Sequence, residues 1–407
     1  MSFAKYPAYK DSGVAWLGEV PGHWEITPLY AVATERDESN AGMLQDNLLS
    51  LSYGKIVNKD INSNDGLLPE SFETYQIVRC DDIVFRLTDL QNDKRSLRSA
   101  LVKQDGIITS AYLAIQPNDA NAYYLSYLFR SYDTTKVFYS MGGGLRQSMK
   151  FSDMKRLPTL LPPPEEQTAI ATFLDHETAK IDALVAEQEK LIALLQEKRQ
   201  AVISHAVTKG LNPNAPMKDS GVEWLGEVPG HWKVKRLRHV AALNPSKSEI
   251  AEFPRDTEVS FLPMEAVGDD GTLNLDRTRP IAEVESGYTY FREGDVTIAK
   301  ITPCFENGKG AVMRGLHNGH GFGTTELIVA RPSEGTTTSD YLHRLFTSRS
   351  FRMLGEAAMY GAGGQKRVPD DFVRDFAVAF PPLSEQTAIA TFLDHETAKI
   401  DALVAEQ

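Results

Sequence analysis

The stretch Glu166–Gln188, EQTAIATFLDHETAKIDALVAEQ, returns without a single change at Glu385–Gln407. The two copies are 219 residues apart, a period far too long for a solenoid repeat. An identical repeat at this distance predicts two large units in tandem, each of which ends in the same element.

The repeated stretch and its continuation have the pattern of a long helix. Apolar residues recur every seven positions in two rows, which together form a coiled-coil seam with polar interruptions. The apolar residues of this seam are Ile170, Leu174, Ile181, Leu184, Leu191, Leu195 and Val202. No glycine or proline occurs between Glu165 and Lys209, whereas Pro162–Pro164 precede the segment and Gly210 ends it. The sequence therefore predicts one helix within residues 165–210, and about 42 residues at 1.5 Å each give a rod of roughly 63 Å.

Two identical helices have identical faces, so we expect them to pack against each other as an antiparallel coiled coil within the chain. A long helix in the core of a bundle is the alternative. The second copy stops at Gln407, where the first continues with EKLIALLQ. Either the distal helix is truncated there, as it looks, or it is naturally short, in which case part of the first helix needs another partner. The residues expected to form this protein-binding surface are Leu174, Ile181, Leu184, Leu191 and Leu195.

Each unit also opens with the same motif. Lys10–Trp24 reads KDSGVAWLGEVPGHW, and Lys218–Trp232 differs from it at one position in 15. We expect the tryptophans of this opening motif to anchor the start of each unit against the base of the helix. His23 and His231 have no acid or thiol at a spacing typical of metal ligands, so structural roles are expected for both.

Between these borders lie two middle segments, residues 25–157 and 233–376, which are much less alike. Short β-branched runs, typical of strands, align between them, and so do short runs typical of helices. The aligned runs are GIITSAYLAIQP (106–117) with GFGTTELIVARP (321–332), and YLSYLFRS (124–131) with YLHRLFTS (341–348). Each middle segment is therefore expected to be a mixed α/β domain, and different surfaces on one frame favour two recognition modules of different specificity.

Composition restricts the class of protein. The 407 residues include only two cysteines, at unrelated positions, which predicts neither a disulfide framework nor a zinc site. The N-terminus lacks the apolar core of a signal peptide and no run approaches 18 apolar residues, so we expect a cytoplasmic protein without a membrane partner. Of the net charge of −12, the two helical segments 165–207 and 385–407 carry −8. The nearly neutral middle segments therefore permit local basic faces for DNA.

The sequence motifs of the relevant enzymes are missing. An amino-type DNA methyltransferase needs a glycine-rich cofactor loop and an Asn-Pro-Pro-aromatic motif, which Asn244-Pro245-Ser246 does not match. There is no GxxxxGK[ST] sequence for a nucleotide, and no paired-carboxylate nuclease motif is evident. We therefore predict no catalytic residue, no metal and no cofactor in this chain.

Candidate DNA-binding residues cluster at two matching places in each middle segment. Arginine pairs with guanine, asparagine and glutamine pair with adenine, lysine mostly contacts phosphate, and glycines let the backbone approach phosphate. The candidates in the first segment are Arg86, Gln91, Asn92, Lys94, Arg95, Arg98, Gly144, Arg146, Gln147 and Lys150. Those in the second are Lys300, Thr302, Glu306, Asn307, Lys309, Gly364, Gln365, Lys366 and Arg367. Any one of them alone is more simply a solvated surface residue, and only their clustering favours DNA binding.

The whole plan resembles the specificity (S) subunit of Type I restriction–modification systems. The opening KDSGVxWLGEVPGHW is similar to the start motif of that family, and PPPEEQTAIATFLDHETAKIDALVAEQEKLIALLQEKRQ is similar to its conserved helix. The segments around RLTDLQNDKRSLR (86–98) and KITPCFENGK (300–309) are similar to its target-recognition regions. The resemblance gives four expected regions: target-recognition domain 1 at residues 1–164, a central conserved helix at 165–210, target-recognition domain 2 at 211–384 and a distal conserved helix at 385–407.

The resemblance implies two globular α/β (mixed α+β) domains, joined by long antiparallel coiled-coil helices and related by a pseudo-two-fold axis. Each domain would read one half of a bipartite, asymmetric DNA site. The implied partners are double-stranded DNA, two methylation (M) subunits that carry S-adenosylmethionine, and restriction (R) subunits. Two alternatives stay open: a self-contained methyltransferase or nuclease, and a coiled-coil scaffold without a DNA role.

Overall fold

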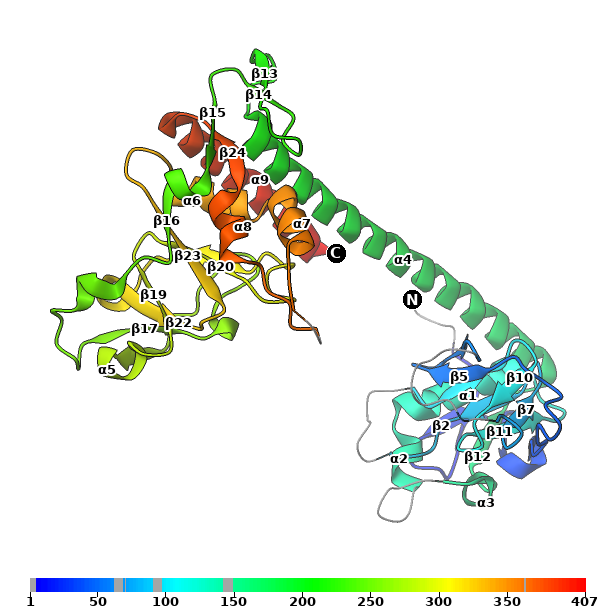
Figure 1. The fold of residues 1–407 in the computed structure, drawn as a ribbon. Helices are drawn as coiled ribbons and strands as arrows, with labels where there is room; N and C mark the ends of the chain where they lie inside the picture. Colours follow the sequence, from blue (N-terminus) through cyan, green and yellow to red (C-terminus); the bar gives the residue numbers. More distant parts are fainter. Residues whose placement is uncertain (1–4, 62–68, 70, 91–96, 142–148, 362–363) are drawn as a thin grey trace. The chain divides into compact units, whose positions relative to one another are not determined.

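The computed structural model of the chain describes residues 5–61, 69, 71–90, 97–141, 149–361 and 364–407. It divides into two compact units, Met1–Leu184 (unit 1) and Val185–Gln407 (unit 2). The helix α4 (Pro164–Lys209) is continuous and passes from unit 1 into unit 2 (Figure 1). Both units mix helices with small sheets, which confirms the predicted fold class. The four expected regions stay predictions.

Unit 1 contains a four-stranded antiparallel sheet in the order β4, β11, β8, β9. Further ladders pair β1 with β2, β3 with β12, β5 with β6 and β7 with β10. The strand bounds are β1 Tyr9–Asp11, β2 Glu19–Pro21, β3 Glu25–Pro28, β4 Ala33–Glu35, β5 Leu49–Ser52, β6 Lys55–Asn58, β7 Gln76–Val78, β8 Ile83–Phe85, β9 Ser99–Leu101, β10 Gly106–Ile108, β11 Leu113–Pro117 and β12 Pro158–Leu161. The helices before α4 are α1 Ala122–Thr134, α2 Val137–Met141 and α3 Phe151–Met154.

Unit 2 repeats this plan with additions. Its sheet β16, β23, β20, β21 has the same strand order and the same antiparallel pairing as the main sheet of unit 1. A second sheet has the order β18, β17, β22, β19. The strand bounds are β13 Met217–Asp219, β14 Glu227–Pro229, β15 Lys233–Arg236, β16 Ala241–Leu243, β17 Glu258–Leu262, β18 Thr278–Pro280, β19 Thr289–Arg292, β20 Val296–Ala299, β21 Gly310–Val312, β22 His320–Gly323, β23 Leu327–Pro332 and β24 Ala377–Phe380. The helices are α5 Ile281–Val284, α6 Ser339–Phe346, α7 Arg349–Ala357, α8 Asp370–Asp375 and α9 Leu383–Glu406.

The two middle segments begin and end on paired strands. In unit 1, β3 pairs antiparallel with β12, and in unit 2, β15 pairs antiparallel with β24. The main sheet, its flanking ladder and the helix α1 or α6 all lie between these two strands in sequence. Each middle segment therefore starts and finishes at one place, next to the start of α4 or α9.

The predicted central helix is confirmed nearly to the residue. Pro164 opens α4, where its missing N–H and fixed φ suit the first helical position, and Glu165 and Glu166 complement the helix dipole there. Gly210, with φ of 76°, follows the last helical residue and donates its N–H to the carbonyl of Ala206.

The helix α9 refines the expectation that identical helices pack together. Within unit 2, Ile389 and Leu393 of α9 share a buried core with Ile203 and Val207 near the end of α4. The side chain of Arg199 on α4 also bonds to Asp401 at 3.1 Å. The partner of the second copy in this unit is thus the continuation of the first helix, beyond the repeated stretch.

The opening motif is anchored as predicted, and the acceptor is the first acid of the repeated stretch. In unit 1, Trp24 Nε1 donates to Glu166 Oε2 at 2.9 Å, and His23 Nε2 lies 2.6 Å from Glu166 Oε1. In unit 2, Trp232 and His231 contact Glu385 in the same way, at 3.1 and 2.7 Å. The hydrogen bond with His23 holds the pKa of Glu166 below its ordinary value.

The next residue of the repeat fastens the domain to the helix. Gln386 donates to the carbonyl of Pro381 at 2.9 Å and accepts from the N–H of Thr338, the residue that caps α6. Gln167 makes the equivalent bonds, to Pro162 at 2.8 Å and from the N–H of Asn121, which caps α1. In each unit the NH₂ group of this glutamine therefore binds the loop before the helix, and its oxygen binds the backbone at the start of α1 or α6.

Candidate nucleic-acid interface

The two predicted DNA-binding loops of unit 2 lie side by side. The Thr302 hydroxyl donates to the carbonyl of Gly364 at 2.7 Å and accepts from the N–H of Lys366 at 3.1 Å. A β-bridge also links Ile301 with Arg367. The 62 residues between Thr302 and Gly364 gave no sequence signal that these loops would touch. Together they form one surface, on which Gln365 and Lys366 are exposed.

Arg367 is held on this surface by an acid that the sequence reasoning missed. Its Nε and Nη2 atoms donate to the two carboxylate oxygens of Glu326, at 2.9 and 2.8 Å. These hydrogen bonds lower the pKa of Glu326. The guanidinium is therefore fixed in orientation and is part of an ion pair rather than a free cation.

The remaining candidates of unit 2 differ in solvent exposure and in their contacts with the rest of the domain. Lys300 is half-buried, and Asn307 is exposed. Glu306 is half-buried, and its backbone carbonyl accepts from Arg352 at 3.0 Å. The Lys309 ammonium donates to the carbonyl of Met264 at 3.3 Å and lies 3.9 Å from Asp269, so it is tied back to the domain.

In unit 1 the structure removes one candidate. Arg98 is fully buried, and its guanidinium donates to Tyr139 Oη at 3.2 Å and to the carbonyl of Thr88 at 3.1 Å. A side chain without exposed surface is a structural residue and does not fit base or phosphate contact. Arg86 is half-buried and Lys150 is exposed. The other candidates of this unit lie outside the described residues: Gln91, Asn92, Lys94, Arg95, Gly144, Arg146 and Gln147.

A cleft next to the predicted loops of unit 2 was not predicted. It has a volume of about 290 Å³ and lies where β16 ends, beside β19 and the end of β20. Its lining includes Asn244, Lys247, Tyr288, Lys300 and Thr325. Of these, only Lys300 was a candidate from the sequence, because the others are scattered over more than eighty residues. The Lys247 ammonium donates to the backbone carbonyl of Glu285, which fixes the side chain at the rim.

Unit 1 has a cleft of about 550 Å³ at the same place in its own fold. Strand pairing shows that the two places are equivalent. Glu35 at the end of β4 lies opposite Ile115 on β11, and Leu243 at the end of β16 lies opposite Ala330 on β23. The residues that follow these two strands line both clefts. In unit 1 the lining includes Glu35, Asp37, Gln76, Ser110, Tyr112 and Lys150.

The chemistry of the two clefts is different. Glu35 and Asp37 are exposed carboxylates at the rim in unit 1, whereas Lys247 and Lys300 bring positive charge to the cleft in unit 2. The amide oxygen of Gln76 is buried in the first cleft and has no hydrogen-bond partner among the described residues. One position of a duplicated fold thus carries acids together with Lys150 in unit 1, and lysines without a carboxylate in unit 2.

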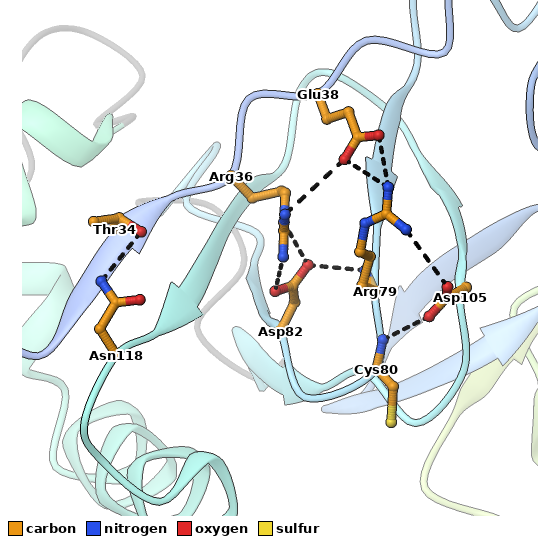
Figure 2. Close-up of polar contacts among 8 residues, drawn as sticks. All are labelled: Thr34, Arg36, Glu38, Arg79, Cys80, Asp82, Asp105 and Asn118. Atoms are coloured by element: carbon orange, nitrogen blue, oxygen red, sulfur yellow. Dashed lines mark hydrogen bonds and ion pairs between the residues drawn. The ribbon is translucent and has the colours of Figure 1, made fainter.

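A network of ion pairs holds Arg36 and Glu38, two residues of the lining of the first cleft (Figure 2). Arg36, part of the lining, donates from Nε and Nη2 to Asp82, both at 2.9 Å, and lies 4.0 Å from Glu38. Arg79 donates to Glu38 at 2.8 Å and lies 4.0 Å from Asp105. Asp82 is only 1% exposed, and its hydrogen bonds raise the pKa of Arg36. The strand ends that form the cleft are therefore held rigidly.

Unit 2 holds the equivalent carboxylate with an arginine from a different strand. Asp295, also 1% exposed, accepts from Nε and Nη2 of Arg331 on β23, at 2.7 and 2.8 Å. In both units the aspartate also accepts a hydrogen bond from the backbone N–H of the residue three positions earlier in the chain. Arg331 has a further partner, Glu249, at 2.8 Å. The aligned aspartates were visible in the sequence, but their arginines were not, because they come from unrelated positions.

The expected protein-binding residues of α4 are largely uncovered within the described structure. Ile181 and Leu184 are each 59% exposed and Leu191 is 42% exposed, whereas Leu174 and Leu195 are half-buried. Such a row of large apolar side chains on a helix surface is typical of a protein interface. Their role in partner binding stays a prediction.

Other kinds of site are not supported where the chain is described. Across residues 5–61, 69, 71–90, 97–141, 149–361 and 364–407, no group of three or more His, Cys, Asp or Glu side chains could hold a metal ion. Within the same ranges, none of the helices combines the length and apolarity needed to cross a bilayer.

Comparison with known proteins identifies related sequences. The chain is 43% identical over 165 residues to the specificity subunit of the Type I restriction enzyme EcoAI of Escherichia coli, and 40% identical over 165 residues to that of EcoEI from the same species. Each match covers 40% of this chain and 27% of the relative, so it spans about a quarter of the relative's length. No family model matches the chain.

Solved structures have the same fold over nearly the whole chain. A structure described as the structural basis of complex assembly and conformational transition of the type I R-M system has a TM-score of 0.67 at 18% identity, and covers 95% of this chain and 93% of that one. The crystal structure of the HsdS subunit from Thermoanaerobacter tengcongensis has a TM-score of 0.50 at 19% identity, with coverage of 95% and 92%. The chain is therefore similar in sequence, over 40% of its length, to specificity subunits of Type I restriction enzymes, and it has the fold of solved structures from these systems.

Proposed function

We propose that this chain is the non-catalytic subunit that selects the DNA sequence for a Type I restriction–modification complex. Each domain reads one half of a bipartite, asymmetric site in double-stranded DNA. The helices set the distance between the halves and dock two methylation subunits, which bring S-adenosylmethionine, and restriction subunits join the full complex.

The observation that carries this proposal is the combination of a repeated frame with different surfaces. The opening motif, the helix acids Glu166 and Glu385, and the strand order of the main sheet are the same in both units. The clefts beside the predicted loops differ in volume and in charge. Shared borders suit two copies of one protein partner, and different domains suit two different half-sites.

Within each domain, the proposed DNA-binding surface includes those described candidates that keep exposed polar groups. They are Arg86 and Lys150 in unit 1, and Lys300, Thr302, Asn307, Gln365 and Lys366 in unit 2. Arg367 joins this set as the oriented member of an ion pair. Base specificity in the major groove needs such fixed donors and acceptors, whereas mobile lysines mainly contact phosphate.

Methylation mapping tests the proposal. The chain is expressed with its cognate methylation subunit in a host without DNA methylation, and the modified bases of the genome are sequenced. We expect a split motif, with two short defined blocks around a fixed gap. A single continuous motif contradicts the two-domain mechanism.

The same experiment separates the alternatives. A scaffold without a DNA role gives stable binding of the methylation subunit but no modified motif. A self-contained enzyme modifies or cuts DNA when the purified chain alone receives S-adenosylmethionine or Mg²⁺. The proposal expects neither result.

A further inference from the structure

We propose that the equivalent clefts are where each domain discriminates between bases, and that they read opposite chemistry. The cleft of unit 1 accepts the amino group of a cytosine, and the cleft of unit 2 donates to a guanine. This inference rests on the proposed function, since it assumes that both domains bind duplex DNA.

The position of the clefts is the first argument. Both form where the strand paired to β11 or β23 ends and the chain turns away, so the same backbone frame supports them. Both are lined by a residue from the predicted DNA-binding segments, Lys150 in unit 1 and Lys300 in unit 2. Concave sites in which a few polar groups converge are common places for ligand recognition. A feature duplicated together with the fold is explained most simply by a shared task.

The lining of the unit 2 cleft is suited to guanine. In the major groove, guanine presents two acceptors, O6 and N7, which lysine and arginine recognise. Lys300 contributes an ammonium, and Lys247 retains free N–H donors because only one is needed for the carbonyl of Glu285. Asn244, also in the lining, binds Asp370 through Nδ2 at 2.9 Å, so it shapes the rim rather than reading bases.

The lining of the unit 1 cleft is suited to cytosine. Carboxylates accept from the N4 amino group of cytosine, which is its major-groove donor. Glu35 and Asp37 are exposed at this rim, on either side of Arg36, whose guanidinium is committed to Asp82. Gln76 also belongs to this lining, although its amide oxygen is buried and out of reach of a ligand.

The test uses full-length variants in the methylation-mapping experiment. The lysine variant Lys247→Ala/Lys300→Ala should lower modification at guanine-containing sites about tenfold and relax that position in one block only. The acid variant Glu35→Gln/Asp37→Asn should change the other block, and adenine should be tolerated where cytosine was required, because amides pair with adenine.

Matched controls are available in both units. Lys233→Ala removes an exposed lysine of unit 2 that does not line the cleft. Asp46→Asn removes an exposed acid of unit 1 that also lies outside the cleft lining. Both controls should leave the motif unchanged, and binding of the methylation subunit reports on folding. If a double variant no longer binds the methylation subunit, the single variants Lys300→Met and Asp37→Asn replace it in the test.

The failures of the two proposals are distinct. If the unchanged chain gives no split motif, the proposed function itself fails. If it gives a split motif but the cleft variants leave both blocks and the level of modification unchanged, the clefts do not read bases. The inference is also overturned if both cleft variants alter the same block, or if the controls change the motif as much as the cleft variants do.

Discussion

At the scale of single residues, the same glutamate is used twice to attach the start of a unit to its helix. Glu166 and Glu385 each accept the indole N–H of a tryptophan and contact a histidine. Their surroundings differ, because Trp232 is fully buried and Trp24 is half-buried. Loss of the glutamate acceptor should therefore destabilise unit 2 more than unit 1.

Replacing Glu385 by alanine should lower the free energy of unfolding of unit 2 by about 1–3 kcal/mol, because a buried indole N–H is left without an acceptor. Glu166→Ala should have a smaller effect in unit 1. Thermal unfolding, followed by tryptophan fluorescence, measures both. The variant Glu385→Gln keeps one acceptor oxygen and should restore most of the loss, and an equal loss in both alanine variants would contradict this explanation.

The attachment of unit 1 should depend on pH. Hydrogen bonding to His23 lowers the pKa of Glu166 in the folded state, so the ionised form stabilises the fold above the ordinary pKa of glutamate, about 4.5. This stabilisation is lost as the pH falls through the lowered pKa. Hydrogen–deuterium exchange in residues 19–24 should therefore accelerate as the pH is lowered below about 4.5, after correction for intrinsic exchange. In Glu166→Gln the acceleration should be absent, and if it persists another group is responsible.

The buried aspartates give a further contrast. Asp82→Ala removes the bidentate partner of the half-buried Arg36 and leaves Glu38 at 4.0 Å, so we expect a loss of about 3–5 kcal/mol in unfolding free energy. Asp295→Ala should cost less, because Arg331 keeps Glu249 at 2.8 Å. Urea unfolding of the two variants measures the difference. Equal losses in the two variants would indicate that the aspartates act mainly by accepting a backbone N–H, which both of them do.

At the scale of elements, the repeated helix shows that one sequence can have two environments. Ile400 on α9 is 4% exposed, whereas its exact copy Ile181 on α4 is 59% exposed. The acid Asp394 binds Arg344 at 2.5 Å, and its copy Asp175 binds Tyr127 at 2.6 Å. The environment of each copy is set by the domain and helix packed against it, since the sequence of the copies is the same.

The two isoleucines form a matched pair for mutagenesis. Ile400→Ala should lower the free energy of unfolding by about 2–5 kcal/mol, because it opens a cavity in a core. Ile181→Ala should change it by no more than about 0.5 kcal/mol, as for other exposed sites. Urea unfolding measures both values. A large loss for Ile181→Ala would indicate that this face is covered in the free protein.

Much of the element plan could be predicted from the sequence, for identifiable reasons. Pro164 and Gly210 are local signals, so the bounds of α4 follow from them. The run Ile107–Ile115 was less informative, because its apolar pattern does not reveal the turn between β10 and β11. The clustering of basic and amide side chains predicts Arg98 as a DNA contact, but the structure buries it beside Tyr139, which is 41 residues away in sequence. Contacts of this kind depend on tertiary structure and leave no local pattern.

At the scale of the whole molecule, the chain consists of one frame used twice with two different surfaces. The clefts could not be predicted, because their linings are assembled from strand ends that are distant in sequence. The duplication itself could be predicted, because its borders are nearly identical. The borders therefore predict what is common to the two units, and only the structure locates the surfaces that differ.

A duplicated middle segment gives a prediction at this scale. When residues 233–376 are replaced by a second copy of residues 25–157, both units have the same surface. The modified DNA motif should then contain the same short block twice, and the block read by the original unit 2 should be lost. Methylation mapping with the unchanged chain as control measures this outcome. Two unlike blocks in this variant would show that the borders also contribute to sequence choice.

The pairing of β3 with β12 and of β15 with β24 has a consequence for evolution. Because each middle segment leaves the frame where it entered, a foreign segment of another length can be inserted without shifting the helix that follows. The matching borders at residues 10–24 and 218–232 also give genetic recombination two points at which to cross over in register. A lineage can thus acquire a new surface on one unit in one event, while the borders and the helices stay the same.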